Sequence, residues 1–206
     1  ASKARAAGIV VVEADRRKLD GMSRTHAHQG VIALAAVREY VSLEDILADA
    51  AAKGEQPLLV VCDEISDPHN LGAIIRTAEC AGAHGVVIPK RRSASLTLTV
   101  GKTSAGAASW LPVARVPNLA SAMETLKKNG VWIYGTDAAG TSYTDADFTG
   151  GTAFVIGSEG FGMSRLVSEK CDAMLSLPMR GKVNSLNASV AAGIFMYEAV
   201  RQRLAK

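Results

Sequence analysis

The sequence predicts an α/β fold with a mostly parallel sheet that helices flank. Five short runs are apolar throughout, at 58–61, 85–88, 131–134, 153–156 and 173–177. Continuous apolar runs of this length are typical of strands that are buried on both faces. Helical segments lie between the runs, and such alternation favours a parallel sheet with ligands at the carboxyl ends of its strands.

The composition is that of a globular protein. The 206 residues are 48% hydrophobic and 21% charged, which excludes intrinsic disorder. No apolar run approaches the ~18 residues of a membrane-spanning helix, so we expect no membrane partner. The net charge of +3 permits an anionic partner without requiring one.

The cysteines and histidines predict neither a disulfide framework nor a metal site. Cys62, Cys80 and Cys171 are far apart, so we expect buried free thiols, a reducing compartment and a cytoplasmic protein. His26 and His28 have the spacing of a metal-binding pair, but nothing near them completes a site. We therefore expect no metal, and two solvated loop histidines.

The N-terminal region differs in texture from the rest. Residues 8–37 hold two apolar runs around a polar stretch, and the chain begins without Met, so we expect that part of a longer chain is absent before it. A helix over 42–52 follows, with Ser42 as its cap and Gly54 at its end. The predicted domains are 1–40, a linker over 41–57, and 58–206.

Four further helices are predicted near 70–81, 118–129, 162–171 and 186–204. The first has a regular apolar face, Gly82 ends it, and Arg76 points away from that face. Asp67 and Pro68 form a good helix entry, a capping residue followed by proline. Capping does not explain Asn70 or Arg76, and an arginine near a strand end could hold phosphate.

Two more polar segments follow predicted strands. In 156–162 (IGSEGFG) three glycines allow a close backbone approach to a ligand, but their spacing matches neither a dinucleotide fingerprint, a phosphate loop nor a nucleophile elbow. In 177–193 a loop with Arg180 and Lys182 precedes a helix whose first turns hold small residues. A cap explains Ser185, but not the density of Asn184, Ser185 and Asn187 together.

Charge runs at 16–18 and at Lys90, Arg91 and Arg92 are most simply solvated faces. Because Lys90 to Arg92, Arg180 and Lys182 lie beside the polar segments, we expect all five to contact phosphates if the site takes a polyanion.

Read in order, the segments at 70–78 (NLGAIIRTA), 156–162 (IGSEGFG), 177–179 (LPM) and 185–191 (SLNASVA) resemble the SpoU/TrmH family of RNA ribose 2′-O-methyltransferases, within the knotted SPOUT group. The resemblance covers about 57–204. It is nearest to the bacterial branch that methylates a guanosine ribose in large-subunit ribosomal RNA. Residues 8–40 resemble the end of that branch's small α/β RNA-binding domain.

The resemblance implies S-adenosylmethionine bound against a deep trefoil knot, which composition and periodicity would not have suggested. It also implies a homodimer in which one subunit's Arg76 works near the other's cofactor. The catalytic residues that it implies are Arg76, Asn70, Glu159, Ser185 and Asn187. The implied cofactor contacts are Gly135, Thr136, Ile156, Gly157, Leu177, Met179, Leu186 and Ala188.

The chemistry of arginine limits the role that Arg76 can have. Arginine has a pKa above about 12, so its guanidinium does not serve as a base. We therefore expect Arg76 to hold phosphate and stabilise a developing alkoxide, while a phosphate oxygen or water takes the proton. Two alternatives stay open: a transfer-RNA substrate, and an RNA-binding or assembly protein of the same fold without turnover.

Overall fold

The computed structural model describes residues 5–6, 11–23, 28–32, 38–158 and 160–205, and the chain divides into compact units of 1–36 and 37–206. In the first unit, α2 (Arg16–Met22) is capped by Asp15. His28 Nε2 lies 2.9 Å from Asp20 Oδ1, and the His28 side chain is 6% exposed. The prediction of a solvated histidine is therefore wrong for His28, and His26 lies outside the described residues.

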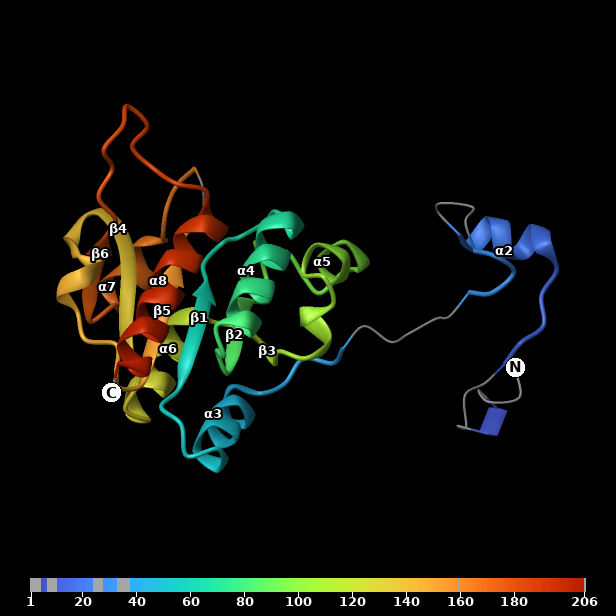
Figure 1. The fold of residues 1–206 in the computed structure, drawn as a ribbon, viewed down its shortest axis with the longest axis horizontal. Helices are drawn as coiled ribbons and strands as arrows, with labels where there is room; N and C mark the ends of the chain where they lie inside the picture. The colour runs from blue at the N-terminus through green and yellow to red at the C-terminus, as the bar shows by residue number, and fades with distance from the viewer. Residues whose placement is uncertain (1–4, 7–10, 24–27, 33–37, 159, 206) are drawn as a thin grey trace. The chain divides into compact units, whose positions relative to one another are not determined.

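The second unit contains a six-stranded sheet in the order β3-β2-β1-β5-β4-β6 (Figure 1). Every neighbouring pair is parallel, which confirms the predicted sheet. The strands are β1 (Leu58–Cys62), β2 (Gly85–Pro89), β3 (Val113–Val116), β4 (Trp132–Ser142), β5 (Thr152–Ile156) and β6 (Ala173–Ser176).

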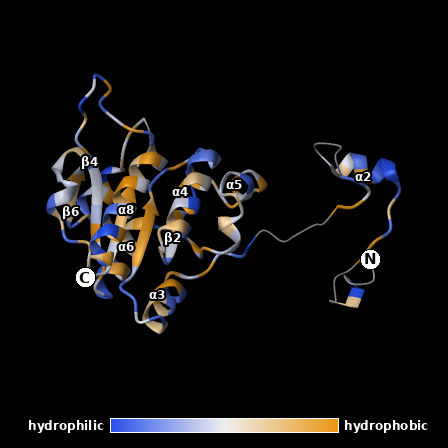
Figure 2. Cartoon of the chain, viewed as in Figure 1, coloured by the Kyte–Doolittle hydropathy of each residue, from blue (hydrophilic) through white to orange (hydrophobic). Residues whose placement is uncertain are grey.

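Helices cover both faces of this sheet. They are α3 (Leu43–Ala52), α4 (Pro68–Cys80), α5 (Leu98–Thr103), α6 (Leu119–Lys128), α7 (Arg165–Glu169) and α8 (Ala188–Leu204), with 3₁₀ turns η1 (Ala107–Ser109) and η2 (Tyr143–Asp145). Val60 and Phe154 pack with α4 and α8, whereas Val61 and Val155 pack with α3 and α6. Successive strand residues thus enter opposite cores, and Figure 2 shows the hydrophobic residues concentrated in the strands and on α8.

The predicted linker over 41–57 holds a helix that belongs to the compact unit. Val41 N donates a hydrogen bond to Val113 O at 3.0 Å, beside the edge strand β3. The α3 side chain of Ile46 is fully buried in the core. Ser42 and Asp45 form a reciprocal capping box, which explains why α3 begins where the sequence predicts.

Several elements differ from the sequence-based expectation. Strand β3 and helix α5 were not predicted, because β3 is four residues long with Arg115 in it and α5 contains Gly101. Strand β4 extends to Ser142 through an irregular pairing with β6. Helix α7 is shorter than predicted, because Gly162 turns back at positive φ before the helix begins.

The cysteines differ among themselves. Cys62 is buried, and burial raises the pKa of its thiol to about 12. Cys80 is exposed, so the prediction of a buried thiol is wrong there, and Cys171 is partly buried. Within the described ranges, no helix is long and apolar enough to cross a membrane, and no group of three or more His, Cys, Asp or Glu side chains could hold a metal ion.

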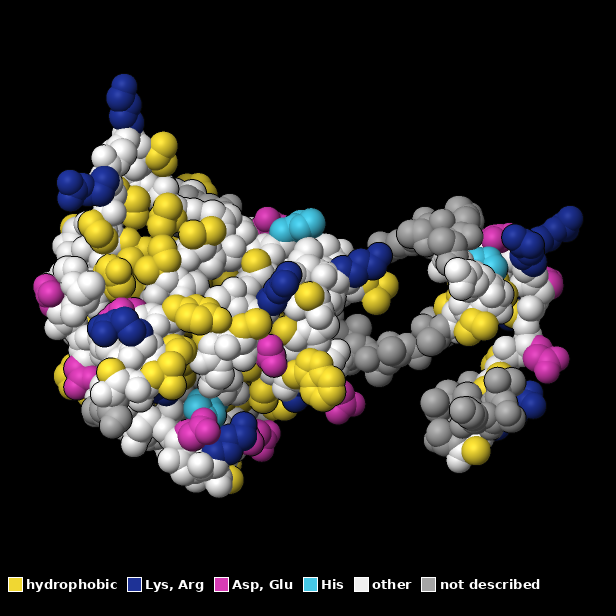
Figure 3. Space-filling model, in the orientation of Figure 1, with side chains coloured by type: hydrophobic (Ala, Val, Ile, Leu, Met, Phe, Trp, Pro, Cys, Tyr) yellow, Lys and Arg dark blue, Asp and Glu magenta, His cyan; other side chains and the backbone are white. Residues whose placement is uncertain are grey.

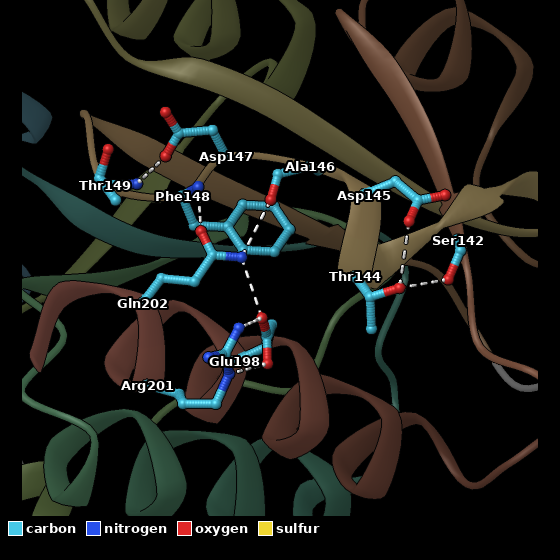
Figure 4. Close-up of polar contacts among 10 residues, drawn as sticks. All are labelled: Ser142, Thr144, Asp145, Ala146, Asp147, Phe148, Thr149, Glu198, Arg201 and Gln202. Atoms are coloured by element: carbon cyan, nitrogen blue, oxygen red, sulfur yellow. Dashed lines mark hydrogen bonds and ion pairs between the residues drawn. The ribbon is translucent and has the colours of Figure 1, made fainter. Parts of the chain in front are cut away.

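The end of α8 forms hydrogen bonds to residues 143–151, which connect β4 and β5 (Figure 4). Gln202 Oε1 accepts a hydrogen bond from Phe148 N at 2.8 Å, and its Nε2 donates to Ala146 O at 2.9 Å. Arg203 donates to four backbone carbonyls, those of Phe148 and Gly150 in this connection and those of Gln56 and Pro57 just before β1. The C-terminal helix is therefore tied to the strands beside it, while the threaded knot stays a prediction.

Candidate functional site

A cavity of about 600 Å³ lies where β5 and β6 end and where β4 leaves its regular pairing, beside the 177–187 loop. Figure 1 shows this loop projecting from the sheet and leading to α8. Figure 3 shows hydrophobic side chains gathered beside this projecting loop, and Lys and Arg side chains on the loop itself. A pocket of this size at the carboxyl edge of a parallel sheet suits a small organic ligand.

Most of the residues predicted to bind the cofactor line this cavity. They are Thr136, Ile156, Gly157, Leu177, Met179, Leu186 and Ala188, and Ser185 of the predicted catalytic set lies among them. Gly135 is not a lining residue: a Cβ there would lie 2.6 Å from Met174 Sδ, so a larger residue would displace the side chains packed against it. The cavity wall is thus mainly apolar side chains and backbone.

The glycine-rich loop after β5, residues 157–162, is closed by hydrogen bonds between its own ends. Ser158 and Gly162 exchange two backbone hydrogen bonds of 2.9 Å, and Gly162 has φ 67°. A Cβ on Gly157 would lie 2.3 Å from the Gly162 carbonyl carbon, so no larger residue fits without opening the loop. Glu159, predicted to be catalytic, lies in this loop but outside the described residues.

A carboxylate that sequence analysis did not select anchors the far end of this loop. Asp63 follows β1 and is 3% exposed, and its Oδ2 accepts a hydrogen bond from Ser164 N at 2.6 Å. The sequence feature that could have identified Asp63 is its position directly after a predicted buried strand.

The first and third motifs meet through two asparagines. Asn187 Nδ2 donates a hydrogen bond to Asn70 Oδ1 at 2.9 Å, and Asn70 is 7% exposed. Asn187 Oδ1 also accepts from Ser189 N and Val190 N, which caps α8. One side chain therefore fixes the start of α8 and links it to α4 next to the cavity.

Arg76 lies apart from this arrangement. It is exposed on α4 and does not line the cavity of its own chain. The side chains around it on α4 that face the sheet, Ile74 and Ile75, are fully buried. Arg76 is thus free to meet a ligand or a second chain.

The predicted RNA-binding residues form two exposed groups. Arg180 and Lys182 lie in the 177–187 loop above the cavity. Lys90, Arg91 and Arg92 follow β2, and Arg92 Nη1 lies 3.1 Å from Glu64 Oε1. Exposed ion pairs of this kind are weak, so Arg92 can exchange its partner for phosphate.

The structure adds Asp137 and Phe195 to the site. Phe195 is 1% exposed and forms part of the cavity wall from α8. Asp137 lies where β4 departs from its regular pairing, and among the described lining residues it alone is charged. Its signal in the sequence was weak, since it lies beyond the predicted end of the strand.

The chain matches two family models, SpoU rRNA Methylase over residues 57–197 and RNA 2′-O ribose methyltransferase substrate binding over residues 1–41. YacO of Bacillus subtilis, assigned to the TrmH family of tRNA/rRNA methyltransferases, is 54% identical over 95% of this chain and 79% of its own length.

Solved structures agree with this match. The SpoU methyltransferase AviRb from Streptomyces viridochromogenes, in complex with AdoMet, is 35% identical with a TM-score of 0.69, over 73% of this chain and 62% of its own. A TrmH/SpoU tRNA modifying enzyme of A. aeolicus is 29% identical with a TM-score of 0.67, over 79% of this chain and 85% of its own. Together with the family match over residues 57–197, these similarities show that the chain belongs to the SpoU methylase family.

Proposed function

We propose that this protein transfers a methyl group from S-adenosylmethionine to a ribose 2′-hydroxyl of RNA, and that its substrate is a guanosine of large-subunit ribosomal RNA. The observation that carries the proposal is that the second and third motifs line one cavity, while the first motif is joined to the third by the 2.9 Å hydrogen bond between Asn187 and Asn70. The AdoMet complex of a related methyltransferase supports the choice of methyl donor.

The cavity fits this cofactor. Backbone around Gly157 and the apolar side chains of Ile156, Leu177 and Leu186 offer amide partners and flat contacts to an adenine. The volume of about 600 Å³ is sufficient for a nucleoside with a folded methionine arm. When bound, the cofactor supplies an electrophilic methyl group on a sulfonium.

The chain's own groups then position and activate the hydroxyl. Arg76 has five N–H donors and no acceptor, so its role is to hold phosphate and stabilise the developing alkoxide. A phosphate oxygen or water accepts the proton. Asn70, Ser185 and Asn187 orient the groups around the reacting atoms, with Glu159 as a further positioning residue.

The exposed position of Arg76 supports a homodimer in which each subunit's Arg76 serves its partner's cavity. Mixing Arg76→Ala with Asn187→Ala chains tests this arrangement. A shared site predicts that the mixture regains activity, because each mixed dimer has one complete site. A mixture as inactive as either variant alone would contradict it.

Residues 1–41 match a substrate-binding model of RNA 2′-O ribose methyltransferases, and the resemblance of this region to the ribosomal branch is what favours ribosomal over transfer RNA. Arg180, Lys182 and the basic group Lys90 to Arg92 would contact the phosphates. We expect the protein to act in the cytoplasm, where its RNA substrate would lie.

The proposal is tested by labelled methyl transfer to ribosomal and transfer RNA, followed by mapping of 2′-O-methyl positions. We expect methylation of one ribosomal guanosine that Arg76→Ala abolishes and Arg76→Lys retains in part. Full activity of Arg76→Ala would remove Arg76 from the mechanism. Modification of transfer RNA alone would replace the substrate, and failure to bind S-adenosylmethionine in calorimetry would indicate a non-catalytic RNA-binding protein.

A further inference from the structure

We propose that Asp137 makes the cavity prefer the positively charged methyl donor to the uncharged thioether product. The inference rests on the proposed function and adds a specificity-determining residue to it. S-adenosylmethionine carries a sulfonium, and loss of the methyl group turns that sulfur into a neutral thioether. Every other part of the molecule is the same in S-adenosylhomocysteine, so a negative charge near the sulfur distinguishes the two.

The backbone places Asp137 over the cavity. Strand β4 pairs with Leu175 of β6 at both Thr136 and Thr141, so the intervening residues leave the ladder. The chain returns to β6 at Gly140, where a Cβ would lie 2.6 Å from the Met174 carbonyl oxygen. This excursion carries Asp137 to the cavity instead of along the sheet.

The Asp137 carboxylate is exposed, and one of its two oxygens is bonded while the other remains for a ligand. Asp137 Oδ1 accepts a hydrogen bond from Ala139 N at 2.8 Å. Oδ2 makes no hydrogen bond or ion pair with the residues that the structure describes. The bond from Ala139 N restricts the carboxylate, so less of its motion has to be lost when it meets a cation.

The rest of the described wall carries no competing charge. Its polar members are hydroxyl and amide side chains, among them Ser158, Ser176 and Asn184. The nearby cations Arg180 and Lys182 are exposed in the 177–187 loop, outside the lining. Asp137 is therefore the one negative charge that the described wall offers to a sulfonium, and the attraction disappears once the methyl group has left.

A second reading of Asp137 makes a different prediction. The same carboxylate could accept hydrogen bonds from a ribose hydroxyl or from the methionine ammonium group. Both groups are present in the donor and in the product, so this role would give Asp137 equal importance for the two ligands. The ratio of the two affinities separates the readings.

The test is calorimetry of the full chain with S-adenosylmethionine, S-adenosylhomocysteine and sinefungin, which carries an amine in place of the sulfonium. Asp137→Asn removes the charge but keeps the oxygen that accepts from Ala139 N. We expect Asp137→Asn to weaken the binding of S-adenosylmethionine and sinefungin by about tenfold, which corresponds to about 1.4 kcal/mol. The binding of S-adenosylhomocysteine should weaken by less than about twofold.

Asp145→Asn is the matched control, since Asp145 is exposed in η2 and does not line the cavity (Figure 4). It should leave all three affinities unchanged. Equal weakening of all three ligands by Asp137→Asn, or no weakening, would overturn the inference while leaving the proposed function intact. A wild-type chain that binds none of the three ligands would overturn both.

Discussion

Replacement of Asn187 separates two contributions that one side chain makes to the site. Its Oδ1 caps α8 by accepting from Ser189 N at 2.9 Å and from Val190 N at 3.3 Å. Its Nδ2 donates to the nearly buried Asn70 at 2.9 Å. Asn187→Ala removes both contributions, whereas Asn187→Ser keeps a capping oxygen but is too short to reach Asn70.

The two variants should differ measurably in stability. Loss of an N-cap costs about 1 kcal/mol. Loss of a hydrogen bond to a buried polar group costs roughly 1–2 kcal/mol. We therefore expect the free energy of unfolding to fall by about 2–3 kcal/mol in Asn187→Ala and by about 1–2 kcal/mol in Asn187→Ser. For a unit of this size, Tm should fall by about 2–4 °C per kcal/mol.

Urea unfolding followed by circular dichroism, with calorimetry of S-adenosylmethionine on the same samples, measures both effects. Because Leu186 and Ala188 flank Asn187 and line the cavity, cofactor affinity should fall in both variants. Equal destabilisation of Asn187→Ser and Asn187→Ala would contradict the prediction, since the cap would then contribute nothing. Additive destabilisation by Asn70→Ala and Asn187→Ser in the double variant would also contradict it, because residues that share a bond should couple.

Three further predictions concern other parts of the compact unit. Gly157→Ala should abolish cofactor binding in calorimetry, because its Cβ would collide with the backbone of Gly162. Gly160→Ala, whose Cβ would meet nothing within 4 Å, should bind the cofactor normally, and normal binding by both variants would refute the steric argument. Arg203→Met should lower the free energy of unfolding by about 3 kcal/mol, because its hydrogen bonds to four carbonyls are lost. Replacement of the exposed Arg201 by Met should lower it by less than about 1 kcal/mol, and equal losses in the two variants would contradict the prediction. Burial lowers the pKa of His84 below 6.5, so the unfolded chain binds the proton more strongly and the free energy of unfolding should fall as pH drops below about 6.5. His84→Gln should make that fall shallower in urea unfolding at several pH values, and an unchanged pH dependence would exclude His84 as its source.

The elements that the sequence predicts well are those with a strong local signal. The apolar runs of β1, β2 and β5 and the caps of α3 and α4 are encoded by consecutive residues. Strand β3 and helix α5 escaped prediction, because an edge strand with a charged residue and a helix with a glycine owe their form to their neighbours. His28 shows the same limit, since its burial depends on the partner Asp20.

The sequence by itself determined the parallel α/β architecture, the family resemblance and the residue types of the three motifs, because periodicity, capping and motif order are properties of neighbouring residues. The tertiary structure alone decided that Asn70 and Asn187 share a hydrogen bond, that Gly135 packs against Met174 instead of lining the cavity, and that Asp137 lines it. These contacts depend on strand order and on the excursion of β4 from its ladder with β6. Both arise from pairing between segments far apart in the chain, which no local pattern encodes.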